Sequence, residues 1–189
     1  MFSKYSNEAK MEVIQSETIG RYYINVLLLK YPDKFSKIFG VLTRAKYTHA
    51  SIGVSNSDGT FYSYTGKGFR KEFPKQHPTF KKQEVPCKLY QVEVTKEIYD
   101  VVKMALSDHE KQAHNFKYNF LGFLLCLLRI VWPIRKRYFC SQFVSEILGQ
   151  MKVIQLEKHS SLYLPDDFTT TRGLDLCFSG HLSQLVAAS

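Results

Sequence analysis

The sequence lacks the features that mark several large classes of protein. Its 189 residues include only four cysteines, which are widely spaced, and no apolar leader opens the chain. We therefore expect a reducing, cytoplasmic setting with free thiols. No apolar run approaches the roughly 20 residues of a transmembrane helix. Close-paired cysteine or histidine ligands and a glycine-rich phosphate loop are also missing, so the sequence predicts no metal or other cofactor.

Negative charge is scarce relative to positive charge. Lysine and arginine number 26 against 17 aspartate and glutamate residues, which gives a formal net charge of +9. Such a surface attracts anionic partners, including phospholipid headgroups. The basic residues form no recognisable nucleic-acid-binding motif, so we expect no specific nucleic-acid partner. A basic face that only contacts solvent and a face that binds an anionic membrane surface remain the two alternatives. The oligomeric state is not indicated.

Repeats, low-complexity tracts and linkers are also missing, so residues 1–189 are interpreted as one domain, with 1–20 as a loose N-terminal arm. Hydrophobic periodicity predicts strands at 22–29, 48–55, 60–65, 87–94 and 174–178, with a long surface loop at 66–86. Helices are predicted at 35–45, 97–112 and 137–151. The pattern is that of an α+β domain with a central antiparallel sheet packed against helices.

The most apolar segment runs from Phe120 to Trp132, but it has 13 residues and contains Arg129. It is too short to cross a bilayer, which needs about 20 residues. We interpret it as a buried helix. The basic cluster at 135–137 keeps a helix on an anionic membrane surface as the alternative, because apolar anchors beside basic residues suit that interface.

Cys140 has the local setting of a reactive thiol. It is predicted in the first turn of the helix at 137–151, where unpaired backbone N–H groups and the helix dipole favour a thiolate. The other three cysteines, Cys87, Cys126 and Cys177, are interpreted as core residues. A buried structural thiol is the competing interpretation for Cys140 as well.

A nucleophilic cysteine needs a base within hydrogen-bond reach, and His49 is the strongest of six histidines. It opens a predicted strand, whose alternation places Ser51 and Gly53 on the same face. That small polar face would leave room for a substrate. On the neighbouring strand, Ser63 or Tyr64 could orient the imidazole, although neither is a carboxylate.

The segments YTHASIGV, 47–54, and YFCSQFVSEIL, 138–148, together resemble the permuted papain-like hydrolases of the NlpC-type superfamily, in the YiiX/YaeF-like branch related to lecithin:retinol acyltransferase-like proteins. FYSYTGKGF, 61–69, KYNFLGF, 117–123, and LYLPDDF, 162–168, extend the resemblance across roughly residues 22–170. In that branch a strand carrying the base precedes a helix headed by the nucleophile. This chain has the same order.

The resemblance implies a circularly permuted papain-like fold with Cys140 as nucleophile, His49 as base and Ser63 at the position where many relatives have an acidic residue or histidine. It implies that the Cys140 backbone N–H helps to form an oxyanion hole, assisted by Tyr47. Beside the substrate we expect Ser51, from the small polar face, and Tyr64. The implied reaction is cysteine-dependent hydrolysis or acyl transfer on a small peptide-type amide, such as a cell-wall fragment, or on a lipid ester.

Ser63 leaves two alternatives open. Either a Cys–His dyad suffices, or the protein is an attenuated ligand-binding or membrane-binding module on the same fold. The expected location is the cytoplasm, with the membrane surface as a peripheral site.

Overall fold

The computed structural model describes residues 21–31, 34–55, 59–74 and 84–187. Six strands form one antiparallel sheet in the order β4-β3-β2-β1-β5-β8. The predicted arm at 1–20 and residues 75–83 of the predicted loop lie outside the described residues. The strands of the sheet are β1 (Tyr22–Leu29), β2 (His49–Val54), β3 (Phe61–Thr65), β4 (Gly68–Glu72), β5 (Pro86–Val94) and β8 (Asp175–His181).

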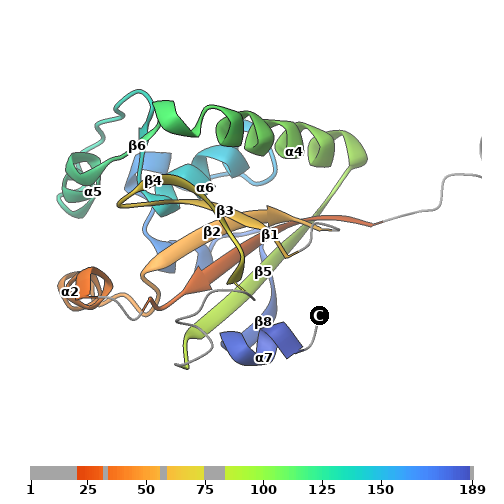
Figure 1. Ribbon diagram of the computed structural model, residues 1–189, viewed down its shortest axis with the longest axis horizontal. Helices are drawn as coiled ribbons and strands as arrows, with labels where there is room; N and C mark the ends of the chain where they lie inside the picture. The colour runs from red at the N-terminus through yellow and green to blue at the C-terminus, as the bar shows by residue number, and fades with distance from the viewer. Residues whose placement is uncertain (1–20, 32–33, 56–58, 75–83, 188–189) are drawn as a thin grey trace, which may run out of the picture.

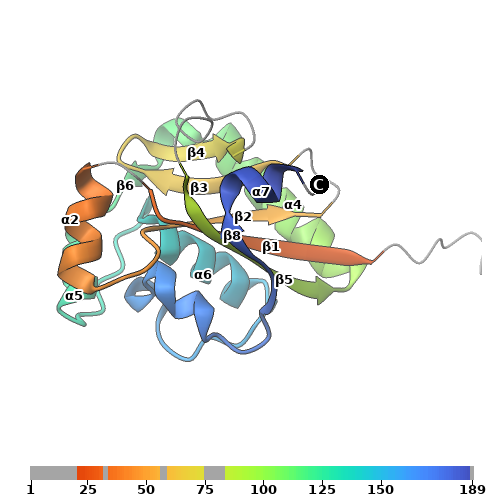
Figure 2. The same ribbon diagram turned by 90° about the horizontal axis from the view of Figure 1, so that it is seen from below.

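Helices cover both faces of this sheet (Figure 1). The described helices are α2 (Lys34–Thr43), α4 (Lys96–Lys111), α5 (Phe120–Leu127), α6 (Cys140–Gln150) and α7 (Leu182–Ala187). Helices α4 and α6 lie over one face, and α7 lies against the other, as the view from below in Figure 2 also shows. A short parallel pair, β6 (Lys117–Tyr118) with β7 (Arg137–Tyr138), flanks α5 and precedes α6. The mixed α+β class with a central antiparallel sheet is confirmed.

The main core lies between the sheet and helices α4 and α6. Alternate residues of β1 and β2 face it, because side chains along a strand point to opposite faces, and they meet the apolar side of α6. These fully or almost fully buried residues include Ile24, Val26, Leu28, Ala50, Ile52, Phe143, Val144, Ile147 and Leu148. A smaller cluster on the opposite face contains Leu27, Leu29, Phe61, Val85, Cys87 and Leu182. The sheet is therefore apolar on both faces.

Most predicted elements are confirmed within one to three residues at their ends. The prediction of a loop across 66–86 is wrong at its start, because β4 pairs with β3 there, with Phe61 opposite Glu72 and Tyr64 opposite Phe69. The turn at Gly66–Lys67 joins the two strands. β4 is an edge strand that exposes Arg70 and Lys71. Charged residues on an edge strand prevent pairing with other chains, and they also make the segment look like a loop.

The apolar segment at 120–132 differs more from its prediction. The helix is shorter, α5 at Phe120–Leu127, and begins where the Asn119 side chain accepts a hydrogen bond from the Gly122 N–H at 2.9 Å. Only Gly122 and Cys126 of the helix are buried. The expectation of a buried helix is therefore wrong. Within the described ranges, no helix has the length and apolar character needed to cross a membrane.

Candidate functional site

Cys140 is the first residue of α6, as the sequence predicts. The chain enters from β7 through Phe139, whose extended backbone (φ −102°, ψ 165°) turns into the helix at Cys140. Packing of Phe143, Val144 and Ile147 fixes α6 on the sheet. Backbone N–H groups in the first turn of a helix have no intrahelical acceptor and lie at the positive end of the helix dipole. The Cys140 sulfur thus sits where negative charge is favoured.

His49 is the first residue of β2, opposite Leu29 of β1. The residue is 6 % exposed, and its ring packs edge-on against Tyr31, with the ring centroids 4.8 Å apart. Its Nε2–H donates to both oxygens of Glu72, at 2.9 and 3.1 Å. Glu72 is the last residue of β4, and its side chain is only 11 % exposed. The imidazole is therefore held by a nearly buried carboxylate.

The His49 ring also interacts with the Cys140 thiol. Burial of the ring opposes its positive charge, but the Glu72 carboxylate and the hydrogen bond with Cys140 outweigh burial and raise the His49 pKa to about 10. Because Nε2 is occupied by Glu72, Nδ1 is the nitrogen left for the sulfur. The arrangement is a carboxylate, an imidazole and a thiol in series, which is the order needed to activate a nucleophilic cysteine.

Ser63 is not the residue that orients His49. Its hydroxyl is fully buried and donates to the backbone carbonyl of Ala50 at 2.6 Å, which ties β3 to β2. Glu72 takes the orienting position from the next strand. Ser63 therefore has a structural bond to the strand that carries His49.

Glu72 was missed because it was assigned to a loop. One sequence signal could have found it: it is the only carboxylate between Asp58 and Glu84, in a stretch rich in lysine. The glycine turn at 66–68 followed by alternating residues could have predicted a second hairpin strand. That strand carries Glu72 to the face of the sheet on which His49 lies.

The three residues expected beside the substrate have different positions. Tyr64 lines the same cavity as His49 and Cys140, and its buried hydroxyl has no hydrogen-bond partner among the described residues. Burial raises the pKa of this hydroxyl, with Tyr138 and Glu146 adding to the effect, so it stays protonated and can donate. Tyr47 and Ser51 are buried and do not line the cavity.

The expected space beside Ser51 and Gly53 is filled by protein. A side chain on Gly53 would meet the Thr60 carbonyl oxygen at 2.7 Å and the Phe61 ring at 3.1 Å. The small residues of β2 thus admit the neighbouring strand rather than a ligand. The expectation of a substrate face at Ser51 and Gly53 is wrong.

The cavity at His49 and Cys140 has a volume of about 440 Å³. It lies where β2 begins and β3 ends, between Ser36 of α2 and Phe120 of α5. Tyrosine and phenylalanine side chains contribute to its lining, and Lys67 adds a basic side chain beside His49. The lining residues are Tyr31, Ser36, Thr48, His49, Tyr64, Thr65, Gly66, Lys67, Tyr118, Phe120 and Cys140.

A larger hollow of about 770 Å³ lies at the other end of α6, beside Gly149 and Gln150. It contains neither Cys140 nor His49. The smaller cavity is therefore the candidate site, because it alone of the two joins a nucleophile to a base.

The loop around Pro165 holds both halves of the site together. Backbone N–H groups of Lys46 and Tyr47, just before β2, donate to the two carboxylate oxygens of Asp166 at 2.6 and 2.8 Å. The hydroxyl of Ser141, next to Cys140, donates to the Tyr163 carbonyl at 2.7 Å. One loop thus contacts the chain beside His49 and the chain beside Cys140.

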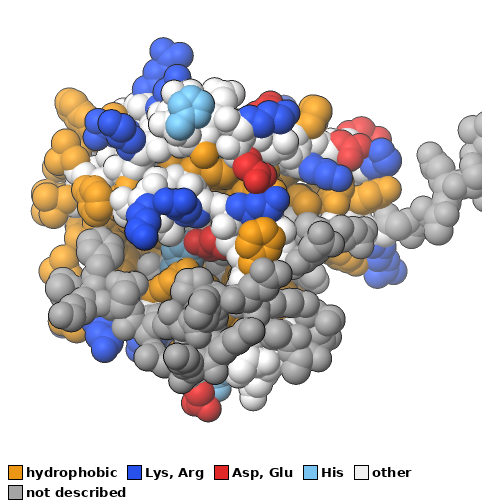
Figure 3. Space-filling model, viewed as in Figure 1, with side chains coloured by type: hydrophobic (Ala, Val, Ile, Leu, Met, Phe, Trp, Pro, Cys, Tyr) orange, Lys and Arg blue, Asp and Glu red, His pale blue; other side chains and the backbone are white. Residues whose placement is uncertain are grey.

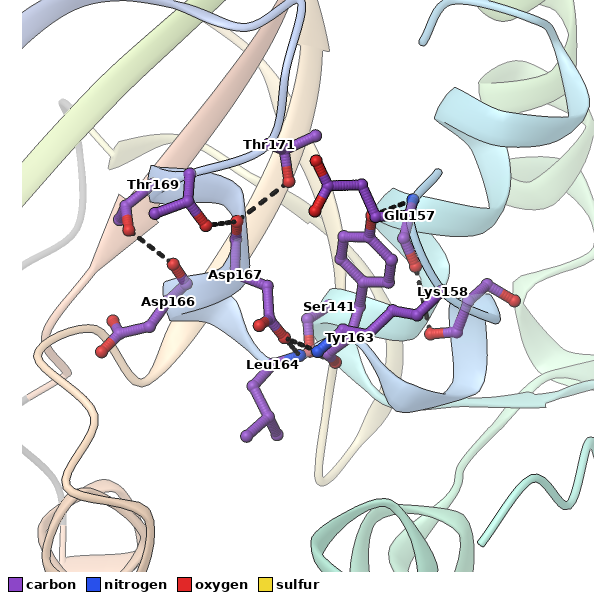
Figure 4. Close-up of polar contacts among 12 residues, drawn as sticks. Ser141, Glu157, Lys158, Tyr163, Leu164, Asp166, Asp167, Thr169 and Thr171 are labelled. Atoms are coloured by element: carbon purple, nitrogen blue, oxygen red, sulfur yellow. Dashed lines mark hydrogen bonds and ion pairs between the residues drawn. The ribbon is translucent and has the colours of Figure 1, made fainter. Parts of the chain in front are cut away.

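The loop is itself braced by Asp167 (Figure 4). Its carboxylate accepts a hydrogen bond from the Leu164 N–H at 2.6 Å and pairs with the Lys158 ammonium at 2.7 Å. Its backbone carbonyl accepts from the hydroxyl of Thr171 at 2.9 Å. These bonds close the turn that presents Tyr163 to α6.

Cys87, Cys126 and Cys177 do not line this cavity. Cys87 and Cys126 are buried, as expected, and burial raises their thiol pKa values to about 12 and about 11. Cys177 is exposed on β8, which contradicts its interpretation as a core residue. It lies on the outer strand of the sheet, where one face meets solvent. All four thiols are free.

Metal ligands do not gather in the part of the chain that the structure describes, where no three histidine, cysteine, aspartate or glutamate side chains could hold an ion. Comparisons with family models, curated proteins and solved structures found no match for the chain.

Proposed function

We propose that this protein is a papain-like thiol hydrolase or acyltransferase with permuted chain order, in which Cys140 is the nucleophile, His49 the base and Glu72 the residue that orients the base. The observation that carries the proposal is the buried His49 ring, bonded to Glu72 on one side and to Cys140 on the other, at the wall of a cavity. Positioned bases of this kind are typical of covalent catalysis.

In the first half-reaction, the Cys140 sulfur attacks the carbonyl carbon of an amide or ester, and the carbonyl oxygen becomes negative. We assign the stabilisation of that charge to the Cys140 backbone N–H and to the Tyr64 hydroxyl, which lines the same cavity and has no hydrogen-bond partner among the described residues. As the intermediate collapses, the bond to the leaving group breaks and His49 gives it a proton. The product is an acyl thioester on Cys140.

In the second half-reaction, His49 takes a proton from water or from an acceptor alcohol or amine. The activated oxygen or nitrogen attacks the thioester, and the sulfur leaves as thiolate. Water yields hydrolysis and another acceptor yields transfer. Glu72 stabilises the imidazolium that is present before the leaving group is protonated and that forms again in the second half-reaction, since its carboxylate bonds Nε2.

Glu72 also bears on the alternative of an attenuated binding module. That alternative rested on Ser63, which offers no carboxylate to the imidazole. With Glu72 2.9 Å from Nε2, the reason for preferring a non-catalytic module is gone. The chain order, with the His49 strand before the Cys140 helix, supports the permuted papain-like assignment.

The lining of the cavity indicates the kind of acyl group that it can hold. Aromatic walls formed by Tyr31, Tyr64, Tyr118 and Phe120 suit an apolar or planar acyl group. A peptide-type amide and a lipid ester both present such a group next to a carbonyl.

An activated ester tests the chemistry without knowledge of the natural substrate. A p-nitrophenyl ester should release p-nitrophenolate and leave an acyl group on Cys140, seen as a mass increase on its peptide. We expect Cys140→Ser to abolish turnover, because the weaker alcohol nucleophile is not activated by the same pair. Cys177→Ser, which removes the exposed thiol, should turn over like the wild type.

Two outcomes would contradict the proposal. One is turnover that survives in Cys140→Ser. The other is acylation found on Cys177 alone, which would mean that the ester reports general thiol chemistry.

A further inference from the structure

An apolar surface lies beside the cavity, on α2, α5 and the segment that follows α5. We call it the α2–α5 surface. Its side chains are between 45 and 82 % exposed, and they make up nine of the thirteen strongly exposed large hydrophobic residues in the described ranges. Figure 3 shows hydrophobic side chains gathered along this edge of the molecule. The members are Val41, Leu42, Phe120, Leu121, Leu124, Leu128, Ile130, Val131 and Trp132.

The exposed face of α5 is apolar where a helix facing water would be polar. Leu121, Leu124 and Leu128 follow one another at helical spacing and are each more than half exposed. The inward side of α5 already has a packing partner, because Phe123 packs on Phe39 of α2 with ring centroids 5.0 Å apart. An apolar patch of this extent marks an interaction site rather than chance exposure.

The segments that form this surface carry basic residues and no acidic ones. Arg129, Arg135, Lys136 and Arg137 are exposed around the segment that follows α5. The sequence has no aspartate or glutamate from residue 117 to residue 145. On the α2 side, Lys37, Arg44 and Lys46 are exposed, and residues 34–57 again contain no acidic side chain.

An apolar centre flanked by basic residues complements an anionic lipid surface. Apolar side chains enter the boundary between headgroups and acyl chains, and lysine and arginine meet the phosphates. A protein partner would match the apolar centre, but it would not require basic residues on both segments of the surface. The charge pattern therefore favours lipid.

The α2–α5 surface is continuous with the candidate site. Phe120 belongs to both, since it is 56 % exposed and also lines the cavity with His49 and Cys140. Ser36, from α2, lines the cavity on the other side. The cavity thus opens beside the apolar surface.

We propose that the α2–α5 surface docks the protein on membranes that contain anionic phospholipid, with the Cys140 cavity at the lipid interface. Helix α5, with eight residues, lies on such a surface rather than crossing it. A consequence that rests on the proposed function is that the acyl group attacked by Cys140 belongs to an amphipathic lipid held in that interface.

Trp132 makes docking directly measurable. It is the only tryptophan in the chain and is 58 % exposed. Cys140→Ser protein is mixed with vesicles of phosphatidylcholine, with or without phosphatidylglycerol. We expect the tryptophan emission to shift to the blue only with the anionic vesicles, because the indole leaves water, and the shift to shrink as salt is raised.

Matched variants test the surface itself. Leu124→Glu places a charge on the α2–α5 surface, whereas Met104→Glu places one on α4 at a residue of similar exposure, 62 % against 52 %. Leu124→Glu should lose the vesicle-dependent shift and co-sedimentation, and Met104→Glu should keep both. Circular dichroism checks that each variant is folded.

Three results would overturn docking: no shift with anionic vesicles, an equal shift with phosphatidylcholine alone, or a Leu124→Glu variant that binds like the wild type. If ultracentrifugation instead finds a dimer that Leu124→Glu dissociates, without vesicle binding, the surface joins two copies of the chain. Vesicle binding without ester turnover would overturn the proposed function and leave docking intact. Ester turnover without vesicle binding would overturn docking and leave the proposed function intact.

Discussion

At the scale of single residues, the candidate site depends on one carboxylate. Glu72 bonds the Nε2 of His49 in a setting where both side chains are nearly buried, 8 and 11 % exposed. A buried ion pair is strongly coupled, because little water screens it. The carboxylate therefore governs both the direction in which the ring points and the ease with which it holds a proton.

Glu72→Gln should lower turnover about 10- to 100-fold, because a hydrogen bond to a charged group contributes about 1.5–3 kcal/mol. The His49 pKa should fall, since the glutamine has no charge to hold the proton. If the reactive form is thiolate with imidazolium, the loss of activity at alkaline pH then moves to lower pH. The pH profile of turnover measures this shift.

Ser63→Ala is the matched control for that experiment. Its hydroxyl bonds the Ala50 carbonyl and does not reach the imidazole. We expect the variant to lose some stability while the pH profile keeps its position. A profile that moves in Ser63→Ala and stays in Glu72→Gln would assign the orienting role to Ser63 after all.

At the scale of elements, the loop at 160–169 contacts the chain on both sides of the site. Asp166 accepts hydrogen bonds from the residues before β2, while Tyr163 accepts one from α6. Neither contact is evident in the sequence, since the partners of Asp166 are separated from it by 120 and 119 positions. The resemblance of LYLPDDF to a family segment marks the loop without giving these bonds.

Asp166→Asn should destabilise the fold by about 0.5–1.5 kcal/mol, because the amide nitrogen cannot accept a hydrogen bond and one of the two backbone N–H groups loses its partner. Urea unfolding measures the loss. Asp175→Asn, at an exposed position on β8, should change stability by less than about 0.5 kcal/mol. Equal effects of the two substitutions would mean that the Asp166 bonds do not brace the loop.

The elements of the fold differ in how well the sequence predicts them. The strand at 22–29 was predicted with its observed limits, because a long run of buried apolar residues has few alternatives. β4 was missed, because edge strands carry the lysines and arginines that also mark loops. The sequence predicts a buried helix at 120–132, because hydrophobicity indicates that these side chains tend to leave water. It does not indicate whether another element of the fold packs over them.

At the scale of the whole molecule, the sequence could identify Cys140 and His49 by their local settings, but not the residue that completes them. His49 and Glu72 come from strands that are not neighbours in the sheet, and α6 brings Cys140 from a distant part of the chain. These side-chain contacts depend on the register of the strands and on where the helix packs on the sheet. The α2–α5 surface is likewise a product of the fold, since α2 and α5 are far apart in sequence and meet through Phe39 and Phe123.

The central claim is that Cys140 and His49 form one reactive pair in the folded protein. The most direct test is the pH dependence of alkylation by iodoacetamide, with each thiol followed by mass spectrometry in wild type and His49→Ala. The exposed Cys177, whose thiol pKa is raised by burial and by Asp175, is an internal reference in every sample.

The account predicts that Cys140 is labelled at about pH 6 at least about tenfold faster than Cys177, because a protonated imidazole favours the thiolate. The raised His49 pKa, about 10, means that the imidazolium persists through neutral pH and is lost only as pH rises through that value. His49→Ala should remove the advantage of Cys140 and leave Cys177 unchanged. Slow labelling of Cys140 at that pH, identical in both proteins, would contradict the account.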